Sequence, residues 1–134
     1  MPVKPDVKPE VAEWVEKAEE DYDGALALMR QRTRPLSNLV CFHAQQCAEK
    51  YIKAALVSHK TSFPNTHDLI TLHDLLEPSV SDLKKVFDSI SVLSPYGVGV
   101  RYPGTASTHE QAKDAVEAMK ETRKFFRKHL ELDD

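Results

Sequence analysis

The sequence has no long apolar run, and it is poor in cysteine, glycine and net charge. No stretch has the length needed to span a bilayer, and the N-terminal MPVKPDVKPE lacks the apolar core of a signal peptide. We therefore expect a cytoplasmic protein with no membrane partner. Charged residues make up 29% of the chain, but the net charge is only −3. Any site for a polyanion must then be local, because no global field attracts nucleic acid.

The two cysteines, Cys41 and Cys47, are six residues apart in one predicted helix. This spacing separates them by about 9 Å along the axis, too far for a disulfide, and both stand at apolar positions, which indicates small core residues. His67 and His73 also lack the three- or four-residue spacing that brings two ligands to one helix face. We predict no metal site and no cofactor.

The length of 134 residues, 41% of them apolar, suits a single domain with one core. Prolines at positions 2, 5 and 9 predict an extended, mobile lead-in over 1–9. A single helical domain is expected over 10–130, followed by an acidic tail at 131–134.

Apolar residues recur at helical spacing along this domain. A first helix begins near Glu10, and its inward seam is Val11, Val15, Ala18, Tyr22, Ala25 and Met29. Its Asp21-Tyr22-Asp23 triplet superficially copies a magnesium-binding Asp-x-Asp, but on a helix the two carboxylates diverge, so we predict a solvated face.

Further helices follow in the second half of the chain. Asn65 or Thr66 is expected to cap a short helix ending near Leu76, and another helix is predicted over 80–93 with Phe87 inward. The last helix begins at a capping box formed by Thr108 and Gln111. The sequence thus predicts an all-α, antiparallel four- to five-helix bundle, with the second and last helices at its centre.

The second helix, over 37–60, is the predicted centre of the fold. One arc is apolar, and the other carries His43, Gln45, Gln46, Glu49, Lys50 and Lys53. The phosphate-binding candidates here are His43, Gln46 and Lys50, which would line a cleft. In the alternative interpretation this polar set is ordinary helix surface, with Gln46–Lys50 and Glu49–Lys53 as four-apart helical pairs. Apolar side chains project from within this polar arc and predict a partner helix or the contact of a homodimer: Leu39, Phe42, Leu56 and Val57.

The irregular stretch 95–107 holds three of the four glycines and leads into the last helix, and such loops tend to be functional. Arg101, Thr105, Ser107 and the helix start at Thr108 would form an anion-binding corner, because guanidinium donors and the helix dipole favour phosphate.

His109 lies in the first turn, where the dipole favours the neutral imidazole. It could act as a base on a ribose 2′-hydroxyl while Arg101 stabilises the phosphorane. Two alternatives remain: phosphate binding without cleavage, or an Arg101 ion pair with the first helix and a His109 that is only a surface residue.

Three blocks of sequence carry a family resemblance. They are FHAQQCAEK at 42–50 with KAAL at 53–56, then FPNTHDL at 63–69, and RYPG at 101–104. Over about 11–126 the chain resembles the HEPN family (higher eukaryotes and prokaryotes nucleotide-binding domain). This family has a helical fold and includes RNase toxins, partners of small nucleotidyltransferases, and members of unknown activity.

The resemblance implies the function in more detail. RNase toxins of the family have an arginine, four to six residues, and then a histidine, whereas seven residues separate Arg101 from His109. The Arg-Tyr-Pro-Gly form is similar to members encoded beside minimal nucleotidyltransferases. The resemblance thus implies a nucleotide- or RNA-phosphate-binding module that pairs with such an enzyme in a toxin–antitoxin-like system. The alternative is a metal-independent endoribonuclease toxin that uses Arg101 and His109.

Overall fold

The computed structural model describes residues 8–31, 36–97, 103–104 and 106–132. These residues form five α-helices and three short 3-10 helices, and they contain no strand. The α-helices are α1 (Pro9–Met29), α2 (Ser37–Ser58), α3 (Leu69–Leu76), α4 (Phe87–Leu93) and α5 (His109–His129); the 3-10 helices are η1 (Glu77–Ser79), η2 (Leu83–Val86) and η3 (Ser94–Tyr96). The predicted all-α bundle is confirmed. Most of the predicted lead-in, 1–7, lies outside the described residues.

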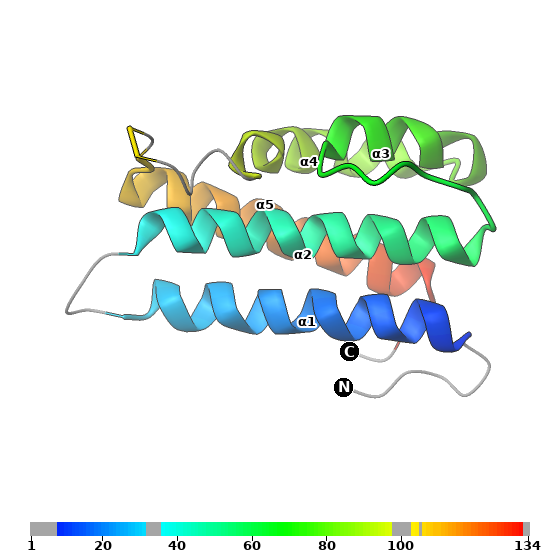
Figure 1. The fold of residues 1–134 in the computed structure, drawn as a ribbon, viewed down its shortest axis with the longest axis horizontal. Helices are drawn as coiled ribbons and strands as arrows, with labels where there is room; N and C mark the ends of the chain where they lie inside the picture. The colour runs from blue at the N-terminus through cyan, green and yellow to red at the C-terminus, as the bar shows by residue number, and fades with distance from the viewer. Residues whose placement is uncertain (1–7, 32–35, 98–102, 105, 133–134) are drawn as a thin grey trace.

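Helix α2 is the centre of the bundle. It contacts α1, α3, α4 and α5, and α1 runs beside it in the opposite direction (Figure 1). Small side chains on α2 allow its neighbours to approach closely: Ala44, Cys47, Ala48, Ala54 and Ala55, all fully buried. Both cysteines are free and buried, as predicted.

The first helix follows the predicted seam. Val11, Val15, Ala18 and Ala25 are buried, and Pro9 stands in the first turn, where its missing N–H has no intrahelical partner to lose. Because α1 ends at the same end of the molecule at which α2 and α5 begin, three helix termini lie close together there (Figure 1). None of the helices in the described part has the length and apolar character needed to cross a membrane.

The predicted start of the third helix was wrong by a few residues. Asp68 is the N-cap of α3, and its carboxylate accepts a hydrogen bond from the Ile70 N–H at 3.1 Å. Thr66 instead accepts from the Asp68 N–H at 3.1 Å. The hydroxyl of Thr66 thus orders the turn before the helix, and Asn65 caps nothing.

The predicted helix over 80–93 divides into η2 and α4. A 3-10 turn holds three residues rather than 3.6, so the helical phase shifts. Phe87 therefore points outward and is 38% exposed, against the prediction, with its ring edge-on to His73 at 4.9 Å between centroids. The buried residues of this segment are Val80, Leu83, Val86, Ile90 and Leu93.

The predicted capping box at the start of α5 is confirmed. The Gln111 N–H donates to the Thr108 hydroxyl at 3.0 Å, and the Thr108 N–H donates to the Gln111 side chain at 2.8 Å. These two bonds satisfy backbone groups that the first helical turn leaves without partners. They fix where α5 begins, and hence where His109 is held.

Candidate functional site

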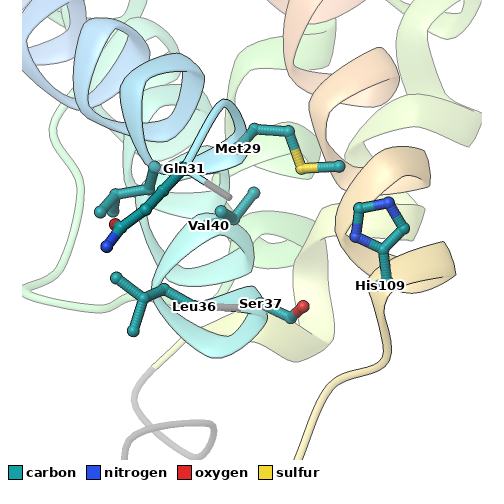
Figure 2. A pocket seen from close by; sticks show the side chains of 7 residues that line it. Met29, Gln31, Leu36, Ser37, Val40 and His109 are labelled. Atoms are coloured by element: carbon teal, nitrogen blue, oxygen red, sulfur yellow. The ribbon is translucent and has the colours of Figure 1, made fainter. Parts of the chain in front are cut away.

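A pocket lies at the end of the bundle where α1 ends and α2 and α5 begin. Its volume is about 190 Å³, and it is lined by Leu28, Met29, Gln31, Leu36, Ser37, Val40 and His109. Figure 2 shows His109 on one side of this pocket, across from Ser37 and the end of the Met29 side chain. The three helices thus bring an imidazole, a hydroxyl and an amide to one space with apolar walls.

Two helices begin at this pocket. Ser37 is the first residue of α2, whose N-cap Leu36 provides no side-chain cap, and His109 is the first residue of α5. The first-turn N–H groups and the positive ends of the helix dipoles favour an anion in such a place. Chemically, the pocket combines a preference for negative charge with an imidazole side chain in its wall.

The entrance to α5 is tied to α2. The Ser107 N–H donates to the Asn38 side-chain oxygen at 2.6 Å, across 69 residues of sequence. Burial raises the pKa of the Cys41 thiol, and a hydrogen bond with Ser107 offsets part of that rise. The Cys41 thiol therefore stays protonated and helps to seat the Ser107 segment on α2. This bonding holds His109 at the pocket wall.

The predicted anion-binding corner is described only in part. Arg101 and Thr105 lie outside the described residues. The backbone of Ser107 is engaged by Asn38, and the side chain and N–H of Thr108 are both used in the capping box. Thr108 therefore stabilises the helix start, and of the described residues of this corner only His109 lines the pocket.

The second predicted set, His43, Gln46 and Lys50, is not part of this pocket. His43 Nδ1 lies 2.8 Å from one carboxylate oxygen of Asp21, and Lys50 Nζ lies 2.5 Å from the other. Gln46 donates to the Gln45 side chain at 2.7 Å. The histidine and the lysine thus pair with α1 rather than lining a cleft with His109.

This pairing overturns the predicted solvated position of Asp21. The residue is 8% exposed. The Lys50 ammonium compensates its charge, and His43 Nδ1 lies within hydrogen-bond distance of its other carboxylate oxygen. Asp23 remains exposed on the other side of α1. Asp21 stands three residues after Ala18 and four before Ala25, so the seam spacing already placed it at the flank of the buried face. That spacing was the available signal.

A buried network that the sequence analysis missed joins α1, α2 and α5. Arg123 donates to Glu19 through Nε at 2.7 Å and through Nη2 at 3.0 Å. The Tyr51 hydroxyl donates to the same carboxylate and accepts from Arg127 Nη1 at 3.2 Å. Arg127 is only 1% exposed, so the basic run at the end of α5 lies in part in the interior.

The protonation states in this network are fixed near neutral pH. Burial alone would raise the pKa of Glu19, but hydrogen bonds from Arg123 and Tyr51 outweigh it and hold the pKa below its ordinary value. Burial is also the main cause of the raised pKa of Tyr51, followed by its bond to Glu19. Glu19 stays a carboxylate and Tyr51 a phenol. The network locks three helices together and has no group poised for proton transfer.

The polar arc of α2 is covered rather than solvated. Glu49 and Lys53 form the predicted four-apart pair at 2.9 Å, and both are buried. The Lys53 ammonium lies over the Trp14 and Phe63 rings, at 5.5 and 5.8 Å from their centroids, and His67 lies 3.0 Å from Glu49. The apolar partner predicted for this side is therefore α1 and the segment before α3, within the same chain.

The four apolar residues predicted as dimer contacts separate into two groups. Leu56 is 0% exposed, so its side chain is inside the single chain and the prediction of a surface contact was wrong for this residue. Leu39, Phe42 and Val57 are partly exposed. Only these three can contribute to a surface on α2.

A second hollow, of about 350 Å³, lies between α4 and α5. Four carboxylates line it, together with Ser89, Val92 and Ala118: Asp88, Asp114, Glu117 and Glu121. This concentration of negative charge repels phosphate. Within the described part of the chain, no three histidine, cysteine or acidic residues gather so that they could hold a metal ion.

The fold and the pocket define a small helical-bundle domain with an anion-favouring end at the start of its last helix. The model of the HEPN domain matches residues 11–129, and the chain therefore belongs to the HEPN family, whose members are nucleotide-binding and RNase-type modules. No curated protein matches the chain.

Two solved structures have the same fold. One is ST0689, an archaeal HEPN homologue, with 20% identity and a TM-score of 0.69 over 90% of this chain and 97% of that one. The other is TT1696 from Thermus thermophilus, with 22% identity and a TM-score of 0.70 over 90% of this chain and 98% of that one. At these identities the likeness concerns the fold alone.

Proposed function

We propose that the chain is a nucleotide- or RNA-phosphate-binding module whose site is the pocket lined by His109. The observation that carries the proposal is that α2 and α5 both begin at this pocket, so two positive helix ends and the imidazole of His109 border the same space. Its volume of about 190 Å³ is below the roughly 300 to 1,000 Å³ of pockets that enclose a whole small ligand. The pocket suits a phosphate or a ribose, with the rest of the ligand outside.

Arg101 supplies the guanidinium in this proposal. It stands eight residues before His109 in the sequence, and its fork of N–H donors matches phosphate oxygens. The acidic hollow between α4 and α5 repels a polyanion. This repulsion disfavours phosphate binding on that face and so supports the pocket at His109 as the phosphate site.

A minimal nucleotidyltransferase encoded nearby is the proposed protein partner, in a toxin–antitoxin-like pair. Two features support this partner: the Arg-Tyr-Pro-Gly form at 101–104, and the engagement of the Asp21 carboxylate by Lys50 and His43. Because Asp21 is engaged in this way, its carboxylate does not offer a magnesium ligand, and in this proposal the partner chain supplies the carboxylates for nucleotide transfer. Co-purification with the product of an adjacent reading frame that has an Asp-x-Asp pattern tests the pairing.

A metal-independent endoribonuclease is the competing proposal, and the position of His109 at the pocket wall favours it. A neutral imidazole there could remove the proton of a 2′-hydroxyl as that oxygen attacks the adjacent phosphate. The products would be a 2′,3′-cyclic phosphate and a free 5′-hydroxyl. We prefer the binding module because seven residues rather than four to six separate Arg101 from His109.

Replacing Arg101 with alanine should weaken binding of RNA or nucleotide by about 1.5 to 3 kcal/mol, the range for a lost hydrogen bond to a charged group. Fluorescence anisotropy with a labelled oligoribonucleotide measures this loss. His109→Ala should leave most of the affinity in place, because one neutral donor contributes about 1 kcal/mol. The matched control is Lys124→Ala, which removes an exposed cation farther along α5 and should change the affinity little.

The same variants separate the two proposals. A binding module shows no cleavage with or without EDTA. EDTA-resistant cleavage by the wild type that disappears in both Arg101→Ala and His109→Ala would replace the binding module with the ribonuclease. If Arg101→Ala and Lys124→Ala reduce affinity equally, the phosphate site is not at this end of the bundle.

We also propose a homodimer that uses the partly exposed surface of Leu39, Phe42 and Val57 on α2. Phe42→Glu should convert it to a monomer in light scattering at tens of micromolar protein, because an isologous contact places the new charge against its own copy. Val92→Glu is the matched control, since Val92 is 43% exposed on α4. A wild-type monomer, or a dimer unaffected by Phe42→Glu, would contradict this surface.

A further inference from the structure

Two histidines meet at the end of the bundle opposite the pocket. His59 directly follows α2, and His129 is the last residue of α5. Their Nε2 atoms are 2.9 Å apart, although 70 residues separate them in sequence. At this distance one neutral ring donates Nε2–H to the lone pair of the other. Two atoms that commonly bind metals thus already share a proton.

The two rings differ in their freedom to move. His129 is partly buried and stacks on Phe125, with 6.4 Å between ring centroids and 7° between planes. His59 is exposed, so its ring can turn while that of His129 is held. Burial lowers the pKa of His129, and the neighbouring His59 lowers it further, against an opposing effect of Asp82.

We propose that His59 and His129 chelate a divalent transition-metal ion, by preference Ni²⁺ or Cu²⁺, through the lone pairs of both Nε2 atoms. The proton of the donor ring moves through solvent from Nε2 to Nδ1, so that both imidazoles stay neutral. With metal–nitrogen bonds of about 2.0 to 2.1 Å, their 2.9 Å separation subtends an angle of about 90° at the ion. This is the angle between neighbouring ligands in square-planar and octahedral complexes. A tetrahedral Zn²⁺ would need the nitrogens about 3.3 Å apart.

The surroundings favour a cation at this place. Both histidines stand at helix C-termini, where the negative ends of the α2 and α5 dipoles converge (Figure 1). The negative charge of Asp82 also favours a positive charge at His129. Among the described residues no third histidine, cysteine or carboxylate completes a set of three, so water fills the other coordination positions. The site is a clamp between two helix ends, and it stabilises the folded chain by mass action.

Titration calorimetry of the full chain with NiCl₂ at neutral pH tests the proposal. We expect one ion per chain, and at least tenfold weaker binding in His59→Asn and in His129→Phe. The phenylalanine retains the stacking on Phe125, so the fold is kept. His67→Gln is the matched control, because it removes an exposed imidazole elsewhere and should leave the affinity unchanged. Nickel is used because it does not oxidise the two thiols as copper can.

Several results would overturn the assignment. Equal affinity in the wild type and in both site variants would show that the ion binds elsewhere. Half an ion per chain together with a doubled mass in light scattering would show that the ion bridges two chains. Tighter binding of Zn²⁺ than of Ni²⁺ would contradict the 90° geometry. As a second measurement, Ni²⁺ should raise the unfolding temperature of the wild type and of His67→Gln, but not of His129→Phe.

Discussion

Replacing Glu19 with alanine should lower the free energy of unfolding by about 3 kcal/mol, because this partly buried carboxylate accepts several hydrogen bonds, and one that involves a charged group contributes roughly 1.5 to 3 kcal/mol. The variant takes away the carboxylate that receives Arg123 and Tyr51. It also leaves Arg127, 1% exposed, without the negative charge 3.9 Å from its Nη1. Urea denaturation followed by circular dichroism measures the loss.

The matched control for this variant is Glu16→Ala on the same helix. Glu16 is exposed, so its replacement should change the free energy of unfolding by no more than about 0.5 kcal/mol. Tyr51→Phe should fall between the two variants, because it removes a hydroxyl from the network but leaves Glu19 with Arg123. If Glu19→Ala and Glu16→Ala have the same effect, the network does not hold the three helices together.

The contribution of Glu19 should also depend on pH. Hydrogen bonds from Arg123 and Tyr51 hold the pKa of Glu19 below its ordinary value despite its burial. A carboxyl whose pKa is lowered on folding contributes stability that is complete above the ordinary pKa and is lost as the pH falls through the lowered one. The difference in stability between the wild type and Glu19→Gln should therefore shrink on acidification from neutral pH. A stability difference that grows on acidification would contradict a lowered pKa of Glu19.

The parts of the fold that the sequence predicted depend on local spacing. The seam of α1 repeats every three or four residues, and the capping box of Thr108 and Gln111 spans a single turn, so neither needs a distant partner. Asp68 is a position at which local spacing does not decide the structure. It caps α3 although Asn65, three residues earlier, is an equally favoured N-cap residue and Thr66 is a favourable one, and only the path of the chain selects among them.

The buried ion pairs could not be predicted, because their partners lie far apart in sequence. Glu19 and Arg123 are 104 residues apart, and Asp21 is separated from Lys50 by 29. A helical wheel assigns such charged residues to solvent, since isolated charges are almost never buried. Once paired, they are tolerated inside the bundle. The interior of this protein is therefore more polar than its wheel projections suggest.

The structure places the predicted site residues in two different environments. His109 was singled out from the helix start and the sequence motif, and it does line a pocket. His43 and Lys50 have the residue types of a phosphate site, but Asp21 engages both of them. Which cations remain available to a ligand depends on the neighbouring helix, and residue type alone does not reveal it.

Leu56 shows how the covering of the polar arc changes a functional prediction. On the wheel it projects among polar residues and resembles Leu39 and Phe42 as a contact for a second subunit. In the folded chain it is 0% exposed, in the last turns of a helix whose charged residues Glu49 and Lys53 are themselves buried. Leu56 therefore packs in the core of a single chain.

Leu56→Ala should accordingly lower the free energy of unfolding by about 3 kcal/mol, within the range of roughly 2 to 5 kcal/mol for truncation of a fully buried leucine. Because the side chain packs inside the chain, this loss should not depend on protein concentration, whereas a residue at a subunit contact gives a loss that does. Urea denaturation at two protein concentrations tenfold apart tests this, with the partly exposed Leu39→Ala as the control. A concentration-dependent loss for Leu56→Ala, or a change in mass by light scattering, would return Leu56 to the interface.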